Sequence, residues 1–223
     1  MVFELFRGGG VRATEIADHI AEMLGDCRLT LEIAFEALFD GENARSLGKE
    51  IRKTDVRVNK AERAIRRELV VHASVRGATA NISMILASMS VAKDAERIGD
   101  YAKNIWDLAA EGIDFADAPD RVMLEAWRHR VLDAVGEVTR VFVERDTEAA
   151  HDRLKMFDDL VDECDAVIRA QIRSEGPARD AVARALLFRY IKRVIAHLMN
   201  ILTSLVMPID RLDYYDEKKA DRE

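Results

Sequence analysis

The chain has 223 residues, of which 49% are hydrophobic and 34% charged, and its net charge is −7 at pH 7. This composition is typical of a globular protein, and the length suffices for one elongated domain or two small ones with a real core. The acidic balance disfavours a broad nucleic-acid-binding surface, although it leaves room for a local basic patch. We therefore expect no direct nucleic-acid partner.

The N-terminal residues and the apolar segments indicate the cellular location of the protein. No apolar run approaches the roughly 20 residues that a membrane-spanning helix needs. The opening MVFELFRGGG lacks the basic start and the long apolar core of a signal peptide, so we expect a cytoplasmic protein. The apolar residues of MVFELF either fold back on the protein or dock on a partner, and RGGG serves as a flexible hinge.

Helical periodicity dominates the chain and strand alternation is nearly absent. The three prolines fall at breaks, and the linker FADAPD (115–120) separates two groups of three predicted helices. The first group covers residues 12–40, residues 43–73, and a helix that follows the break at Gly77 and runs to Gly112. The second group covers residues 120–145, 147–174 and 178–206.

The two halves resemble each other, which indicates a duplicated three-helix unit. The third predicted helix contains ERIGDYAKNI (96–105) and the sixth contains KRVIAHLMNI (192–201), which share an Arg, an Asn and an Ile at equal positions. The second and fifth helices share an acidic stripe at steps of four and three residues. The stripes are Asp55, Asn59 and Glu62 in the first half and Asp158, Asp162 and Asp165 in the second.

These patterns predict an all-α fold of two tandem three-helix bundles. Residues 1–12 form an N-terminal tail and hinge, 13–113 the first unit, 119–207 the second unit, and 208–223 a charged C-terminal tail. The sixth helix is apolar almost all round, which indicates deep burial or a partner surface.

Carboxylates on the third helix carry the hypothesis of a metal site. Glu96 and Asp100 lie four residues apart, where like charges destabilise a helix by roughly 0.2–0.5 kcal/mol, and Gly99 costs about 1 kcal/mol relative to Ala. The neighbouring seam is made of small residues, so we expect the second helix to approach closely and to gather hard oxygen ligands for a cation. The predicted ligands are Glu96, Asp100, Asp55, Asn59 and Glu62, with Asp158 and Asp162 as a weaker second-repeat site.

The same stripe also fits a solvated face with salt bridges. Lys93 and Lys103 each lie three residues from an acid of the third helix, and Arg66 lies four residues after Glu62. Because the spacing E-x-x-x-D is common in helices, spacing alone favours this interpretation over a metal site.

KDAERIGDYAKNI (93–105) resembles the signature of the PhoU family, whose repeats carry an acidic pair followed by Asn-Ile. The stripe DVRVNKAERAI (55–65), the repeat and the length are similar as well, over about residues 13–206. The resemblance implies two three-helix bundles with surface metal sites, in a non-enzymatic accessory regulator of phosphate uptake and signalling. The implied metal ion is iron, zinc, manganese or magnesium.

The resemblance also implies partners. They are a membrane phosphate transporter subunit and a sensor histidine kinase, so the chain would be peripheral to the membrane through a partner, and a homodimer stays open. The second repeat departs from the signature, because Lys192 and Ala196 replace its acids and Ile195 replaces its Gly. We expect Lys192 to neutralise Asp158 and Asp162 without metal. The departure leaves open a divergent role, such as pairing with another type of phosphate permease.

Other kinds of site have less support. A ferritin-like di-iron centre needs two Glu-x-x-His motifs, and only Glu148 with His151 fits. No Ser–His–Asp or Cys–His arrangement can be recognised, and Cys27 and Cys164 are expected to be buried, reduced thiols. The alternative to a regulator is a metal-binding or metal-storage carboxylate protein whose site is itself the function.

Overall fold

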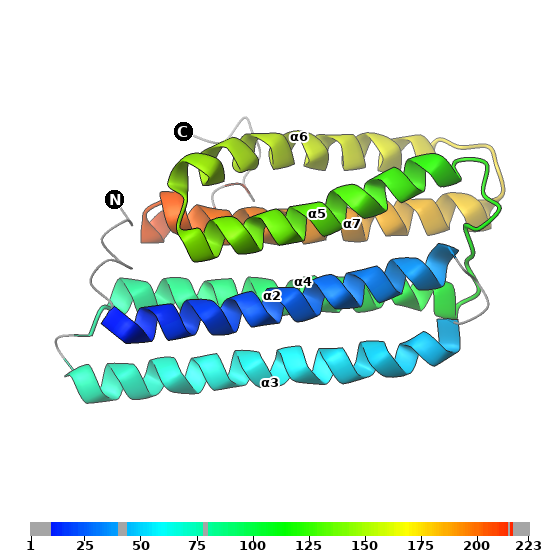
Figure 1. Ribbon diagram of the computed structural model, residues 1–223. Helices are drawn as coiled ribbons and strands as arrows, with labels where there is room; N and C mark the ends of the chain where they lie inside the picture. The colour runs from blue at the N-terminus through cyan, green and yellow to red at the C-terminus, as the bar shows by residue number, and fades with distance from the viewer. Residues whose placement is uncertain (1–9, 40–43, 78–79, 214, 216–223) are drawn as a thin grey trace.

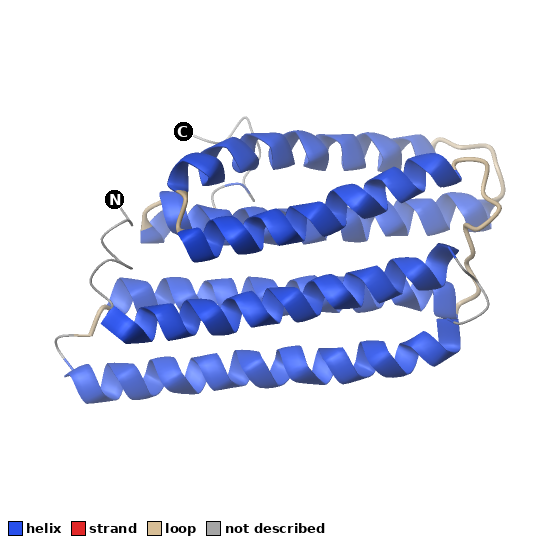
Figure 2. Ribbon diagram, viewed as in Figure 1, coloured by secondary structure: helices blue, strands red, loops and turns tan. Residues whose placement is uncertain are grey.

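The computed structural model describes residues 10–39, 44–77, 80–213 and 215, in which all regular structure is helical (Figure 2). The predicted helices are all present, with small differences at their ends. They are α2 (Gly10–Phe39), α3 (Ala44–Arg76), α4 (Ile82–Ala110), α5 (Arg121–Glu144), α6 (Thr147–Ile172) and α7 (Ala178–Val206), followed by the short turn η2 (Ile209–Arg211).

The helix ends follow from local chemistry. Gly77 and Gly112 have positive φ angles of 53° and 81°, a conformation that favours glycine and ends α3 and α4. The side chains of Asn81 and Asp146 each accept a hydrogen bond of 3.0 Å from the backbone N–H three residues later, which caps α4 and α6.

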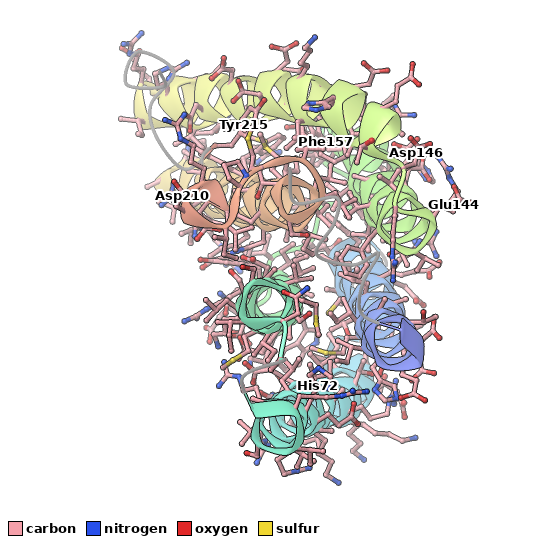
Figure 3. The ribbon with its side chains drawn as sticks, turned by 90° about the vertical axis from the view of Figure 1, so that its left-hand side faces the viewer. His72, Glu144, Asp146, Phe157, Asp210 and Tyr215 are labelled. Atoms are coloured by element: carbon pink, nitrogen blue, oxygen red, sulfur yellow. The ribbon has the colours of Figure 1, made fainter. Side chains whose placement is uncertain are left out.

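The helices form two triangular units that lie side by side (Figures 1 and 3). The first unit contains α2, α3 and α4, and the second contains α5, α6 and α7. The inner helices join the units, because α2 packs on α5 and α4 packs on α7, while α3 and α6 lie at opposite outer edges. One hydrophobic core runs through both units. The predicted pair of three-helix bundles is therefore confirmed as a single packed arrangement.

Helix α7 shows why the sixth predicted helix is so apolar. It packs on α4, α5 and α6, and Ile191, Val194, Leu198 and Ile201 are completely buried. Of the two explanations left open by the sequence, deep burial is confirmed for these residues.

A buried polar cluster lies between the units, where α4 meets α7. Nδ1 of His197 is 2.9 Å from a carboxylate oxygen of Asp94, and the Asn200 amide donates to the same oxygen at 3.3 Å. The ring of Tyr101 stacks on His197 with 5.7 Å between centroids, and it contacts Tyr190 at 6.2 Å. Because buried polar groups are costly without partners, this cluster favours one relative position of α4 and α7.

The predicted tails lie mostly outside the described residues. Residues 1–9, which include MVFELF, and residues 216–223 are among those not described. Helix α2 begins at Gly10, inside the segment predicted to be a hinge. Among the described residues, no helix is both long enough and apolar enough to cross a membrane.

Candidate functional site

The small-residue seam of α4 lies where the sequence predicted, but its glycine has a different role. Ala95, Gly99 and Ala102 are buried. A methyl group added at Gly99 would lie 3.6 Å from Val58 and 3.5 Å from Cys27, which is ordinary van der Waals contact. The expectation that close packing explains the glycine is therefore wrong, because this position has room for Cβ.

Close approach of α3 and α4 occurs instead at Gly48. A methyl group there would come within 3.0 Å of three atoms of the Trp106 ring on α4. The tight contact between the two helices is thus made by a glycine of α3 and an aromatic ring of α4. It lies one helical turn or more from the acidic stripe.

The acidic stripes of α3 and α4 meet at Lys103. Its ammonium nitrogen lies 3.2 Å from a carboxylate oxygen of Asp55 on α3 and 3.3 Å from one of Asp100 on α4. Burial lowers the pKa of Lys103, but the hydrogen bonds and charges of the two aspartates outweigh it and raise the pKa overall. A protonated amine therefore holds the position between the helices where we expected a metal ion.

The remaining predicted ligands have partners on their own helices. Glu96 accepts a hydrogen bond of 2.5 Å from Lys93, and Glu62 forms an ion pair of 2.7 Å with Arg66. The Asn59 amide donates to the backbone carbonyl four residues earlier, at 2.9 Å. Only Asp55 and Asp100 are bridged across the helices, and the other predicted ligands do not converge with them.

The second repeat also carries a lysine between its helices. Both carboxylate oxygens of Asp165 on α6 lie 2.7 Å from Nζ of Lys192 on α7. The predicted Lys–Asp pair is present, but its partner is Asp165 rather than Asp158 or Asp162. These two aspartates lie nearer the start of α6, half-buried and exposed respectively.

The described residues contain no group of three or more His, Cys, Asp or Glu side chains placed to hold a metal ion. The first-repeat donors have the right chemistry for a hard cation, yet each charged donor already faces an amine or a guanidinium. The geometry is suited to one cation between Asp55 and Asp100. A metal there remains a prediction, and it would require Lys103 to leave.

The two thiols are as inert as the sequence indicated. Cys27 is completely buried, and burial is the main cause that raises its pKa. Burial also raises the pKa of Cys164 to about 12. Neither thiol is poised as a nucleophile, since that role needs an accessible thiolate.

A hollow of about 220 Å³ lies between α5 and α6. Phe157 (Figure 3), Met156 and Leu160 contribute apolar surface to it, and Arg130 and Glu137 contribute charged groups. None of its lining residues is a histidine, cysteine or serine.

Sequence analysis missed the cluster around Asp94. Its signal was a charged residue between apolar residues of the third predicted helix, together with a histidine between apolar residues of the sixth. Together with the paired charges on the outer faces, these features define an all-helical protein built of two three-helix units. Residues 20–109 match the family model of the PhoU domain.

The chain is also similar to two proteins that are both called phosphate-specific transport system accessory protein PhoU homolog. The protein of Deinococcus radiodurans is 29% identical over 193 residues, which cover 80% of this chain and 85% of the relative. The protein of Synechocystis sp. is 24% identical over 180 residues, 77% of this chain and 78% of the relative.

Solved structures share the fold. PhoU from Pseudomonas aeruginosa superimposes with a TM-score of 0.74 at 22% identity, covering 88% of this chain and 96% of the other. The phosphate transport system regulatory protein PhoU from Streptococcus pneumoniae gives a TM-score of 0.69 at 16% identity, covering 94% and 97%. At these identities the likeness concerns the fold alone.

Proposed function

We propose that the chain is a non-enzymatic, cytoplasmic accessory regulator of phosphate uptake and phosphate signalling. It docks through its helices on a membrane phosphate transporter subunit, on the partner histidine kinase, or on both. The observation that carries the proposal is the PhoU domain match in the first unit. The names of the relatives and the two-unit fold support it.

A gene deletion in the source organism tests this role. We expect the deletion to deregulate uptake of radiolabelled phosphate and expression of a phosphate-starvation reporter when phosphate is plentiful, with rescue by the full chain. Affinity capture should then retain the purified transporter subunit or the kinase. Unchanged uptake and reporter expression at both high and low phosphate would overturn the proposal.

We also propose that the first repeat binds a metal ion in competition with Lys103. Two carboxylates from different helices already face one positive charge, and the Lys103 side chain is 35% exposed, so it can swing into solvent. Asp55 and Asp100 would hold the ion, with Glu96 as the next nearest donor along α4 and Asn59 and Glu62 on α3. Manganese, magnesium, zinc and iron suit such oxygen donors to different degrees.

Calorimetric titration with each of these ions tests the site. Lys103→Met should tighten binding by roughly tenfold, because the ion must otherwise break two partly exposed ion pairs worth up to about 1 kcal/mol each. Replacing Glu96 and Asp100 with Ala should abolish binding. Replacing Asp158 and Asp162 with Ala is the matched control and should leave it nearly unchanged. If neither wild type nor Lys103→Met binds any of the ions, the stripe is a salt-bridged face, and the regulatory role stands without it.

A further inference from the structure

Helix α3 has the opposite charge from the rest of the protein. Its sequence contains ten Lys and Arg residues against four Asp and Glu residues, a net charge of +6, whereas the whole chain carries −7. It is also an outer helix, which packs mainly on α2 and α4 and turns its other side away from the molecule (Figures 1 and 3).

The positive charge of α3 is concentrated on its outward side. Ile51, Val58 and Ile65 are buried, and the exposed positions lie on the opposite face of the helix. Between residues 46 and 67 of α3, Glu50 is the one exposed acidic residue and Val56 the one exposed apolar residue. We call the outward residues the basic edge: Lys49, Arg52, Lys53, Lys60, Arg63 and Arg67.

The basic edge is long and largely unneutralised. From Lys49 to Arg67 it extends for about 27 Å along the helix axis, at 1.5 Å per residue. Within the part of the chain that the structure describes, Lys49, Arg52, Lys60 and Arg67 form no ion pair with a carboxylate. The neighbouring Arg57, by contrast, pairs with Asp26 of α2 at 2.6 Å.

An exposed apolar cluster continues the basic edge at the end of the α3–α4 hairpin. Figure 3 looks onto this end of the molecule, where His72 marks the last turns of α3. The most exposed of its side chains is Val75, at 78%. We call this cluster the apolar tip: Val70, Val71, Val75, Ile82 and Leu86.

We propose that the basic edge and the apolar tip together dock on the surface of an anionic phospholipid bilayer. Lysine and arginine side chains on a convex helix suit the phosphates of a flat, extended surface, and apolar side chains at one end can enter the boundary of the acyl chains. A nucleic acid would use the same cations but would leave the apolar tip without a partner. The lipid surface accounts for both features.

The charge distribution of the whole molecule supports one orientation. Helix α6, at the opposite outer edge, exposes Glu148, Asp152, Asp159, Asp162 and Glu163. An anionic surface therefore attracts the α3 side and repels the α6 side, which directs α6 and the hollow beside it away from the bilayer. This contact goes beyond the proposed regulatory role, in which a protein partner alone holds the chain at the membrane.

Co-sedimentation of the full chain with vesicles tests the proposal. Vesicles of phosphatidylcholine with about 30% phosphatidylglycerol should bind the protein, while vesicles of phosphatidylcholine alone should not. Binding should weaken several-fold between about 50 mM and about 200 mM salt, because exposed charges are screened. Replacing Lys53, Lys60 and Arg67 with Glu should reduce binding at least about tenfold.

A matched control makes the same change in net charge on other helices. Replacing Lys155, Arg169 and Arg189 with Glu, all exposed on α6 and α7, should leave vesicle binding within about twofold of wild type. Replacing Val75 and Ile82 with Ser should weaken the binding that persists at higher salt. Melting curves and helical circular dichroism show whether each variant is folded.

Four outcomes would overturn the proposal. One is equal binding to the neutral and anionic vesicles, and another is an equal loss in the control variant. The third is tighter binding to double-stranded DNA than to the anionic vesicles at the same salt. The last is self-association of the protein without vesicles, if it weakens with salt and is lost in the α3 variant. In that case the basic edge would bind the acidic α6 side of a second copy of the chain.

Discussion

Alanine at position 99 should stabilise the protein, although it adds a side chain to a buried helix crossing. Helix propensity alone favours Ala over Gly by about 1 kcal/mol in a helix interior. The added methyl would touch Cys27 and Val58 at 3.5 and 3.6 Å, so it gains contacts without overlap. We expect Gly99→Ala to raise the free energy of unfolding by about 1 kcal/mol. For a chain of this length, that corresponds to a rise in Tm of about 2–4 °C.

Gly48→Ala is the same substitution at a position without room for a methyl group, and it should not stabilise the protein. Its methyl would overlap the Trp106 ring, so the propensity gain is opposed by repacking that costs about 1–3 kcal/mol. Urea and thermal denaturation of both variants, followed by far-ultraviolet circular dichroism, measure the two changes. A loss of stability in Gly99→Ala, of the size seen in Gly48→Ala, would refute the geometry argued for the α3–α4 contact.

Three further variants or reagents test other parts of the structure. Asp94→Ala should cost about 3–5 kcal/mol of stability because it strips His197 of a buried partner, whereas Asp94→Asn should cost clearly less; equal losses would contradict the hydrogen-bond role. The hydrogen bond from Arg184 lowers the pKa of Asp120, so the ionised pair stabilises the folded state above the ordinary carboxyl pKa and this stability is lost as the pH falls through the lowered value. Asp120→Asn should therefore be less stable than wild type at neutral pH, and the difference in the free energy of unfolding should shrink as the pH falls. A difference that stays constant with pH would contradict the ionised pair. Cys164, with a pKa of about 12, should resist alkylation at about pH 8 until urea unfolds the chain; rapid labelling of the native protein would show that this thiol is accessible.

The helices were predictable because apolar periodicity reports burial directly. Ile51, Val58 and Ile65 were placed on one stripe of the second predicted helix, and all three are buried. Helix breaks at Gly77 and Gly112 were predictable for an equally local reason, since positive φ angles favour glycine.

The candidate site was less predictable because it depends on how two helices are rotated against each other. The spacing showed that Lys103 could reach Asp100 on the same helix, but not that it also reaches Asp55 on α3. For the same reason, the spacing did not show that Lys192 contacts Asp165. The basic edge of α3 was hidden for a different reason, because the net charge of the whole chain averages it with the acidic residues of α6.

The contacts between the two units are related to each other by one step in the sequence. Arg97 and Arg193 lie 96 positions apart, and the same step relates Asp94 to Tyr190 and Tyr101 to His197. The Asp94–His197 contact and the Tyr101–Tyr190 contact are therefore the two equivalent halves of one interface.

In a symmetric homodimer these halves would be identical by necessity, because each residue would occur on both sides. Fusion of the two copies into one chain removes that constraint, and each half can then mutate independently. Here one half pairs a carboxylate with an imidazole, and the other places two tyrosine rings in contact. Such an interface fits the first unit to the second. Two first units from neighbouring chains could not pair in the same way without placing Asp94 against the ring of Tyr101.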